Sequence, residues 1–264
     1  MIGPILSLSP LHSRDHMATA QRVLATNDWY ENESDDDGSE LQNGIATLTI
    51  SGPMLGIDLC PNPIVFSTPR GTAFVREMAA NPECKGLLIE VASGGGDVSG
   101  VQELCAAIRS FGKPVAAYIH CACSAAYWAI SGAGKIYGGR TSQVGSLGTY
   151  AVLCDYSKEL EQEGIKLHLV STGEMKGAGA DGVITEAYIE QVRGIVTGIN
   201  DEFKADVASG RGVETAALFD GRVWLAKDPA ARPLCEIGTK EDAVRFVADV
   251  MARAAYSKAL AAAR

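Results

Sequence analysis

The sequence predicts an α/β protein with one main domain, because strand-type and helix-type patterns alternate along most of its length. Two short apolar runs, Gly86–Val91 and Pro114–Ile119, are rich in β-forming residues, as expected of strands covered on both faces. Between them, apolar residues from Val98 to Ile108 repeat at helical spacing. This order of strand, glycine turn, helix and strand predicts a βαβ unit, and 264 residues are enough to bury a sizeable core.

The other elements are predicted from the same periodicities. At Ala46–Ile50 apolar residues alternate with threonines before a Ser-Gly-Pro turn, which predicts a strand. The next elements expected are a helix from about Ser124, a strand pair around Lys135–Leu153, a charged helix near Asp155–Glu163 and a strand at Ile165–Val170. A long helix should follow, because apolar positions from Ile189 to Val207 fall on one face. A last helix is expected from Thr239 into an alanine-rich tail.

Three regions are expected along the chain. Residues 1–43 form a flexible N-terminal arm with an acidic linker at Glu31–Glu40, where acids crowd without apolar spacing. Residues 44–250 form the main domain, and residues 251–264 are the alanine-rich end of the C-terminal helix. Self-cleavage in the acidic linker is a hypothesis that rests on its expected disorder.

Charge and hydropathy exclude several classes of function. The 23 basic and 32 acidic residues give a formal net charge of -9, which argues against binding nucleic acid or an anionic membrane. No apolar stretch approaches the roughly 18 residues of a membrane helix, and no basic segment with an apolar core begins the chain. We therefore expect neither a signal peptide nor a transmembrane segment, and a cytoplasmic location.

The cysteines predict buried, reduced thiols. There are seven, an odd number, and none are spaced as Cys-x-x-Cys. Cys121 and Cys123 could begin a metal site, but the four histidines are scattered and a zinc site needs three or four ligands. No metal and no cofactor are expected.

Two glycine- or alanine-rich turns follow predicted strands. The first, Ala92–Gly100, resembles a dinucleotide fingerprint only superficially, because Ser99 stands at the third glycine position and the next strand ends at His120 rather than at an acid. Consecutive glycines still allow backbone N–H groups to converge on an anion or a polarised carbonyl. The second turn places Ser124 at the start of an apolar helix, where it is either an N-cap or a nucleophile.

Three residues are candidates for a general base. His120 would lie about 13 Å from Ser124 in an extended segment, and His168 falls within a predicted strand. Lys176 lies in the polar loop Ser171–Ala180 and would need burial to act as a base near neutral pH. The residues alone leave this choice open.

Several short motifs occur in a fixed order along the chain. They are Ser93-Gly-Gly-Gly-Asp-Val, Lys113-Pro-Val-Ala-Ala, Ala122-Cys-Ser-Ala-Ala-Tyr-Trp128, Val144-Gly-Ser-Leu-Gly148, Lys176 and Asp220-Gly-Arg-Val223. This ordered set resembles the signal peptide peptidase A family (S49) of serine peptidases, from about Ile45 to Val247. Within that family the chain is most similar to phage head-maturation (capsid assembly) proteases, through the run Ala-Cys-Ser-Ala-Ala-Tyr.

The resemblance implies a ClpP/crotonase-like fold built from ββα units and a catalytic Ser-Lys dyad. It implies Ser124 as nucleophile, Lys176 as general base and Ser146 as a hydrogen-bond partner of the lysine. Backbone N–H groups of Gly95, Gly96 and Ala125 would form the oxyanion hole. The family's Asp-Ser-Pro-Gly-Gly is Ala92-Ser-Gly-Gly-Gly96 here, which loosens the first turn.

The implied function is a serine endopeptidase that assembles as a homo-oligomer and cleaves scaffold, capsid or portal proteins in the host cytoplasm or prohead. One alternative is a cytoplasmic S49-type peptidase that degrades peptides. A crotonase-like acyl-CoA enzyme would need neither Ser124 nor Lys176. An inactive scaffolding protein would have no reason to keep all three of Ser124, Ser146 and Lys176. Cys123 as nucleophile is a further variant, although its side chain would point away from that of Ser124.

Overall fold

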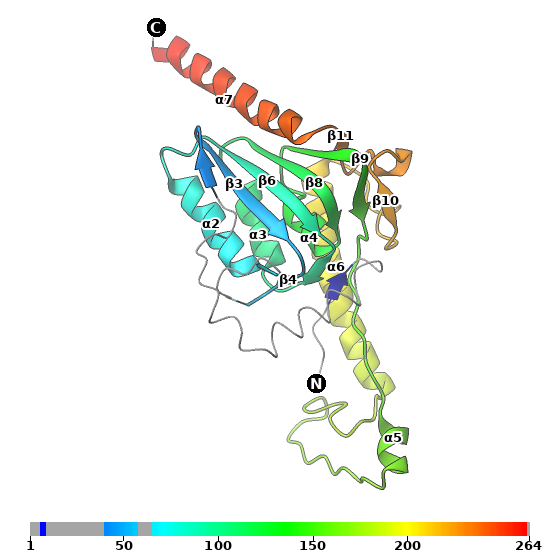
Figure 1. Ribbon diagram of the computed structural model, residues 1–264. Coiled ribbons are helices and arrows are strands. Elements are labelled where there is room, and N and C mark those ends of the chain that lie inside the picture. The colour runs from blue at the N-terminus through cyan, green and yellow to red at the C-terminus, as the bar shows by residue number, and fades with distance from the viewer. Residues whose placement is uncertain (1–5, 9–39, 58–64, 263–264) are drawn as a thin grey trace.

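The computed structural model describes residues 6–8, 40–57 and 65–262. Its main sheet has seven strands, which are β2 (Glu40–Gln42), β3 (Ile45–Ser51), β6 (Gly86–Ser93), β8 (Val115–Cys123), β9 (Lys135–Gly145), β10 (Val223–Leu225) and β11 (Glu236–Ile237). The central strands β3, β6, β8 and β9 are parallel neighbours (Figure 1). The strands expected at 46–50, 86–91 and 114–119 are thus confirmed.

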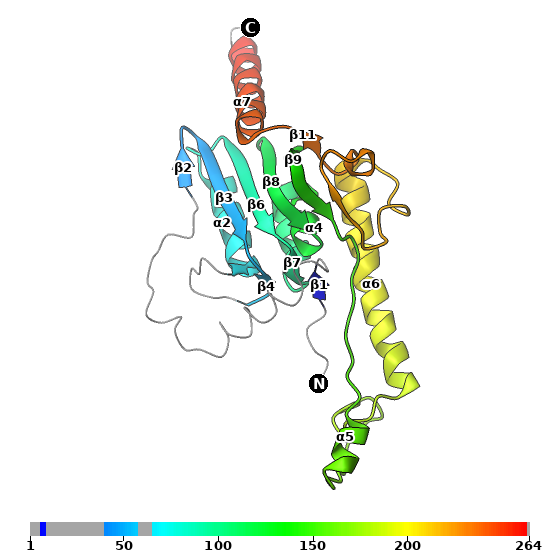
Figure 2. The same ribbon diagram turned by 45° about the vertical axis from the view of Figure 1, so that its right-hand side comes forward.

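A second, smaller sheet lies beside the carboxyl ends of the central strands (Figure 2). Its order is β1 (Leu6–Leu8), β7 (Gly95–Asp97), β4 (Met54–Leu55) and β5 (Phe66–Ser67). β7 forms within the glycine-rich segment that was expected to be an open turn, because its backbone pairs antiparallel with β1 and parallel with β4. The first glycine turn is therefore partly a strand.

Helices cover both faces of the main sheet. One face packs against α2 (Thr68–Ala80), α3 (Val101–Arg109) and α4 (Ala125–Ile130), and the other against α7 (Lys240–Ala262). Alternate side chains of β6 lie on opposite faces of the sheet. Leu87 and Ile89 belong to the large core, and Leu88 packs against Val247 of α7. A short 3₁₀ helix, η2, spans Pro229–Ala231.

The connections confirm the predicted α/β class and its ββα units. β3 is followed by β4, β5 and α2, and β6 by β7 and α3. In both units a long central strand leads into a short strand of the second sheet, and a helix then returns across the large core. β8 instead runs directly into α4, which places the start of that helix at the edge of the sheet.

A long extension projects from the domain. It consists of residues 150–185, with the short helix α5 (Ser157–Gln162), and returns along α6 (Glu186–Arg211) (Figure 2). The helix α6 starts where the Thr185 side chain accepts the Tyr188 N–H and ends at Gly212, in the left-handed conformation. The expected charged helix, long helix and C-terminal helix are confirmed.

Two sequence expectations about strands are wrong. Residues 165–170 form no strand; Ile165, Leu167 and Leu169 alternate as a strand would, but they are exposed and pair with no strand among the described residues. The strand pair around residues 135–153 is a single strand, β9, with a register shift against β8. The helix α2 was not predicted, because Pro69 and Gly71 obscure its periodicity.

Some expectations fall partly or wholly outside the described residues. Of the acidic linker only Glu40 is described, as the first residue of β2. Cys60 also lies outside. Among the six described cysteines, none of which forms a disulfide, Cys154 is exposed and Cys121 half-buried, which corrects the expectation of uniform burial. None of the helices in the described ranges has the length and apolar character needed to cross a membrane.

Candidate active site

The predicted serines and glycines meet where three parallel strands end. In the sheet register Ser93 of β6 stands beside Ala122 of β8, and Cys123 of β8 stands beside Gly145 of β9. The residues that follow these positions are the glycine-rich strand β7, Ser124 and Ser146. Because carboxyl ends of parallel strands share one edge of a sheet, the three segments lie together, in the place where α/β proteins commonly bind ligands.

Ser124 occupies a strained turn between β8 and α4. Its φ is 58° and its ψ is -123°, in a region that L residues rarely adopt, and the residue is 1% exposed. Its N–H donates to the Gly145 carbonyl at 2.8 Å, and its carbonyl accepts the Trp128 N–H at 2.9 Å. A serine held in a strained strand-to-helix turn is an arrangement used by nucleophilic enzymes.

The glycine-rich segment is held close to its neighbours by a serine. The Ser93 hydroxyl donates to the Gly52 carbonyl at 2.6 Å and accepts the Gly95 N–H at 3.1 Å. A Cβ at Gly96 would lie 2.1 Å from the Met54 carbonyl oxygen, so the approach of β7 to β4 requires glycine there. Gly95 is one of the residues whose backbone N–H is predicted to bind an oxyanion. This N–H would have to break its hydrogen bond to the Ser93 hydroxyl before it could donate to an oxyanion.

Ser146 follows Gly145 directly and is also in the left-handed region, with φ at 52°. Its N–H donates to the Arg222 carbonyl at 2.6 Å, and it is 4% exposed. The structure therefore places Ser146 one residue from the carbonyl that holds Ser124. Apart from Asn43, these two serines are the non-glycine residues with positive φ in the described part of the chain.

Lys176 is not brought to Ser124 within one copy of the chain. It is exposed in the extension, where its N–H donates to the Gly173 carbonyl and its carbonyl accepts the Ser171 hydroxyl. The neighbouring Gly179 lies against Tyr188 near the start of α6, whereas Phe203 of α6 stacks on Trp128 at 4.8 Å. Fifteen helical residues separate these contacts, about 22 Å along the axis, which exceeds the reach of a lysine side chain.

The two histidines considered as bases lie elsewhere. His120 is exposed on β8, at the register shift, and packs edge to face on Tyr118 with ring centroids 5.0 Å apart. His168 is exposed in the extension, in the segment that was expected to be a strand. In the described ranges no three His, Cys, Asp or Glu side chains gather as metal ligands would.

Sequence reasoning missed a buried charged network behind Ser124. Asp206 of α6 accepts the Trp128 Nε1–H at 2.8 Å and pairs with Arg109 of α3 at 2.8 Å. This hydrogen bond with Asp206 raises the pKa of Arg109. The network fixes α4, which begins beside Ser124, to α6, which carries the extension. The signal in the sequence is an acid on the apolar face of a helix, three residues after Phe203.

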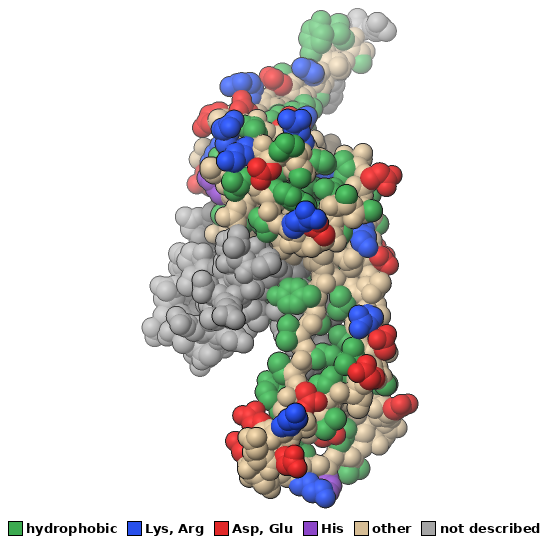
Figure 3. All heavy atoms as spheres, turned by 90° about the vertical axis from the view of Figure 1, so that its right-hand side faces the viewer, with side chains coloured by type: hydrophobic (Ala, Val, Ile, Leu, Met, Phe, Trp, Pro, Cys, Tyr) green, Lys and Arg blue, Asp and Glu red, His purple; other side chains and the backbone are tan. Residues whose placement is uncertain are grey.

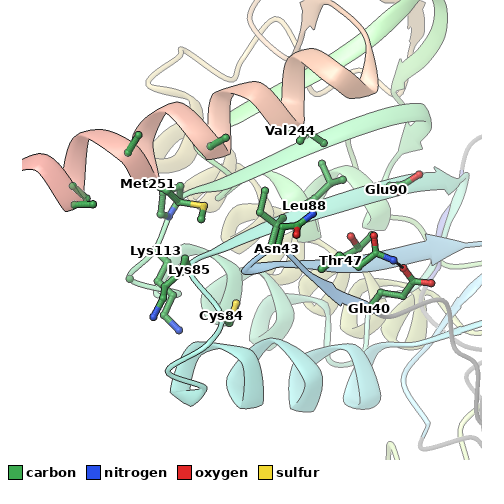
Figure 4. A pocket seen from close by; sticks show the side chains of 18 of the residues that line it. Glu40, Asn43, Thr47, Cys84, Lys85, Leu88, Glu90, Lys113, Val244 and Met251 are labelled. Carbon is green, nitrogen blue, oxygen red and sulfur yellow. Dashed lines mark hydrogen bonds between the residues drawn. The ribbon is translucent and has the colours of Figure 1, made fainter.

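A large groove lined by described residues lies away from this site. Its volume is about 1240 Å³, and it runs between α7 and the outer face of β3 and β6 (Figure 4). Thr47, Leu88 and Glu90 line the sheet side, and Val244 and Met251 line the helix side. No predicted catalytic residue lines it, so the strand ends are the better candidate for chemistry.

Comparisons with known proteins point in the same direction. The model of peptidase family S49 matches residues 107–254. Capsid assembly protease C of Escherichia phage lambda is 30% identical over 187 residues, which cover 66% of this chain and 42% of that protein. Protease 4 of Salmonella typhi is 27% identical over 188 residues, covering 67% of this chain and 30% of that protein. The chain thus spans less than half the length of either relative.

Solved structures of low identity also resemble the chain. An enoyl-CoA hydratase from Shewanella pealeana is 13% identical, with a TM-score of 0.48, over 81% of this chain and 72% of that one. An enoyl-CoA hydratase/isomerase family protein from Silicibacter pomeroyi is 14% identical, with a TM-score of 0.48, over 81% of both. At this level of similarity, neither structure bears on the chemistry.

Proposed function

The chain belongs to peptidase family S49, and we propose that it is a serine endopeptidase whose nucleophile is Ser124 and whose general base is Lys176 of a second copy. The observation that carries the proposal is the strained backbone of Ser124 where three strands end. Such strain costs about 1–3 kcal/mol and persists where the surrounding structure holds the residue for function. A serine serving only as an N-cap needs no positive φ.

The chemistry needs a base, a nucleophile and donors for the oxyanion. Ser124 Oγ attacks the scissile carbonyl as the neutral lysine amine takes its proton, and the lysine then passes the proton to the leaving amine. N–H groups of Gly96 and Ala125, and of Gly95 once it leaves Ser93, would stabilise the oxyanion. Water then releases the acyl group from Ser124, with the Ser146 hydroxyl orienting the lysine.

Two features of the extension support a lysine from a second copy. First, a lysine is neutral near pH 7 only when burial lowers its pKa, and Lys176 is exposed in a single copy. Second, eight of the thirteen large hydrophobic side chains exposed on the described residues belong to residues 152–183. Figure 3 shows hydrophobic side chains along the extension, interspersed with acids. A cluster of this kind marks an interaction surface, so a neighbouring copy would bury both it and the lysine.

Substrates of this site would bind as extended chains. The glycine strand β7 accepts an antiparallel strand on its outer edge, because β1 pairs there with Ser7 opposite Gly96. A peptide that took this position would make backbone hydrogen bonds beside the oxyanion donors. The site therefore favours unfolded or flexible segments of proteins.

The relative from phage lambda supports a more specific substrate class. That protein is named a capsid assembly protease. We infer that the present chain likewise cleaves scaffold, capsid or portal proteins during assembly of a phage head. General degradation of peptides in the cytoplasm is the alternative, and the cleaved substrate decides between them.

The test is to incubate the wild-type chain and Ser124→Ala with an unfolded protein and to identify new peptide ends by mass spectrometry. New ends with wild type alone support the serine mechanism. Equal cutting by both would overturn it. Ser146→Ala is expected to lower kcat by about 10- to 100-fold without abolishing cleavage, because it removes a positioning group rather than the nucleophile.

A further inference from the structure

Two thiols stand immediately before the candidate nucleophile. Cys121 and Cys123 both belong to β8, and their Sγ atoms lie 3.9 Å apart. Residues two apart in a strand point to the same face, which brings the sulfur atoms together. We propose that this pair is a modification site, oxidised by a peroxide to a disulfide that reversibly inactivates the enzyme. The inhibitory effect rests on the proposed function, whereas formation of the disulfide does not.

Cys121 is better placed to react with an oxidant than the buried thiols Cys105 and Cys235. Cys121 is half-buried, so an oxidant can reach it, while Cys123 is buried. The hydrogen bond with Cys123 lowers the pKa of Cys121, whereas burial raises the pKa of Cys105 and Cys235. Since the thiolate is the form that reacts with peroxide, oxidation should begin at Cys121.

A second observation supports a polar intermediate at this position. Gln143 of β9 stands beside Cys121 in the register, and its Oε1 is buried without a hydrogen-bond partner among the described residues. A buried amide oxygen in this state is costly unless something donates to it. The hydroxyl of a sulfenic acid on Cys121 is such a donor.

The oxidation is balanced in two steps. The Cys121 thiolate attacks one oxygen of hydrogen peroxide, which gives the sulfenic acid and, with a proton, one water. Cys123 Sγ then attacks the Cys121 sulfur, the S–O bond breaks, and the proton from Cys123 leaves with the hydroxyl as a second water. Two thiols and one peroxide become one disulfide and two waters.

The geometry predicts a disulfide that reduces easily. Residues two apart in a strand have Cα atoms about 6.6 Å apart, at the upper limit for disulfides, so β8 must shorten to form the bond. The register shift between Ile119 and Cys121 shows that this part of the strand already departs from regular pairing. Strained disulfides are labile, and labile disulfides are the regulatory ones.

Shortening the strand would act directly on the nucleophile. Cys123 pairs with Gly145 in the register, and the next residue, Ser124, is held by its hydrogen bond to the Gly145 carbonyl. Displacement of the Cys123 backbone by the disulfide therefore shifts the turn that holds Ser124 in its strained conformation. Because small misplacements of a reacting atom lower rates strongly, we expect at least a 10-fold loss of activity.

The experiment uses the full chain with Cys60→Ser and Cys154→Ser, which removes the thiol outside the described residues and the exposed thiol of the extension. This protein and the same protein with Cys121→Ser are treated with hydrogen peroxide and then with dithiothreitol. The mass of tryptic peptide 110–135, which holds Cys121 and Cys123 and no other cysteine, is measured with cleavage activity at each stage. Cys154→Ser alone serves as the control for effects of the background.

The expected result is a mass loss of about 2 Da in peptide 110–135 together with an activity loss, both reversed by dithiothreitol and both absent with Cys121→Ser. An unchanged mass, or a gain of oxygen atoms without the loss, would overturn the modification site. A disulfide that forms without loss of activity would overturn the inhibitory part. If the chain has no peptidase activity at all, the mass of the peptide still shows whether the disulfide forms. Failure of the proposed function can therefore be distinguished from failure of the modification site.

Discussion

The backbone N–H of Ser124 donates a hydrogen bond of 2.8 Å to the carbonyl oxygen of Gly145. This bond joins the end of β8 to the end of β9 and helps to hold Ser124 in the left-handed region. The residue after Gly145 is Ser146, which also has a positive φ, of 52°. The hydrogen bond therefore joins the two segments that carry the serines of the candidate site, and Ser146 is held in addition by the bond from its N–H to the Arg222 carbonyl.

Gly145→Ala is expected to disrupt this arrangement. The φ of Gly145 is 126°, and an added Cβ would lie 2.4 Å from the Arg222 carbonyl oxygen. We expect a loss of about 2–4 kcal/mol in the free energy of unfolding, measured in urea, and loss of cleavage. Gly198→Ala, on an exposed face of α6 with nothing within 4 Å, is the control and should be neutral or slightly stabilising. Equal stability of the two variants would contradict the packing described.

Asp206→Ala should destabilise the packing of α4 against α6 behind Ser124. The change leaves the buried Trp128 N–H without its acceptor and Arg109 without its partner, which should lower the free energy of unfolding by about 2–4 kcal/mol. Asp201→Ala removes the exposed pair with Lys204 on the same helix and should change it by less than about 0.5 kcal/mol. A small effect of Asp206→Ala would show that α4 and α6 are held by their apolar contacts alone.

Acid should loosen the extension. The Ile184 N–H and then the Ser157 side chain and N–H donate to Asp155, which lowers the pKa of its carboxyl to about 2. Because this pKa lies below the unfolded value near 3.9, the contribution is complete above about pH 4 and is lost as the pH falls through 2. The protection factor of the Ile184 N–H, which compares its hydrogen exchange with the intrinsic rate at the same pH, should therefore fall between pH 4 and 2.

Asp155→Asn should show the faster exchange already at neutral pH, and Glu161→Gln on α5 should not. Exchange at Ile184 that does not depend on Asp155 would mean that the carboxylate does not anchor the extension.

Deletion of residues 1–8 should raise the cleavage rate on a short peptide by several-fold. An extended substrate competes with β1 for the edge of β7, so removing β1 leaves that edge open. The effect should lie in KM rather than kcat, because β1 blocks binding rather than chemistry. A lower rate after deletion would show that β1 is needed to shape the site.

Elements with their own periodicity were predictable from the sequence. β3 alternates, β6 and β8 are continuous apolar runs, and α6 keeps one apolar face, and all four form as expected. Residues 165–170 show why an alternating apolar pattern can mislead. Ile165, Leu167 and Leu169 give this pattern whether their apolar side chains are to be covered by the chain's own sheet or by another copy, so the pattern alone does not predict a strand of the sheet. The helix α2 was missed because its sequence has a weak apolar pattern.

The candidate site was predictable only in its local parts. The glycines at the start of β7 and the small residues around Ser124 are visible in short windows of sequence. That Ser146 lies beside Ser124 depends on the register of β8 against β9, which a single sequence does not determine. The same holds for Asp206 and Trp128, which are 78 residues apart.

The central claim is that Ser124 and Lys176 of different copies form one active site. The most direct test mixes two inactive variants, Ser124→Ala and Lys176→Ala, after each has been purified alone. The account predicts that neither variant cleaves an unfolded protein by itself, and that the mixture regains a substantial fraction of wild-type activity, because some sites pair an intact serine with an intact lysine from the other variant. A mixture that stays as inactive as its components, while an affinity tag carried by one variant co-purifies the untagged other, would contradict it.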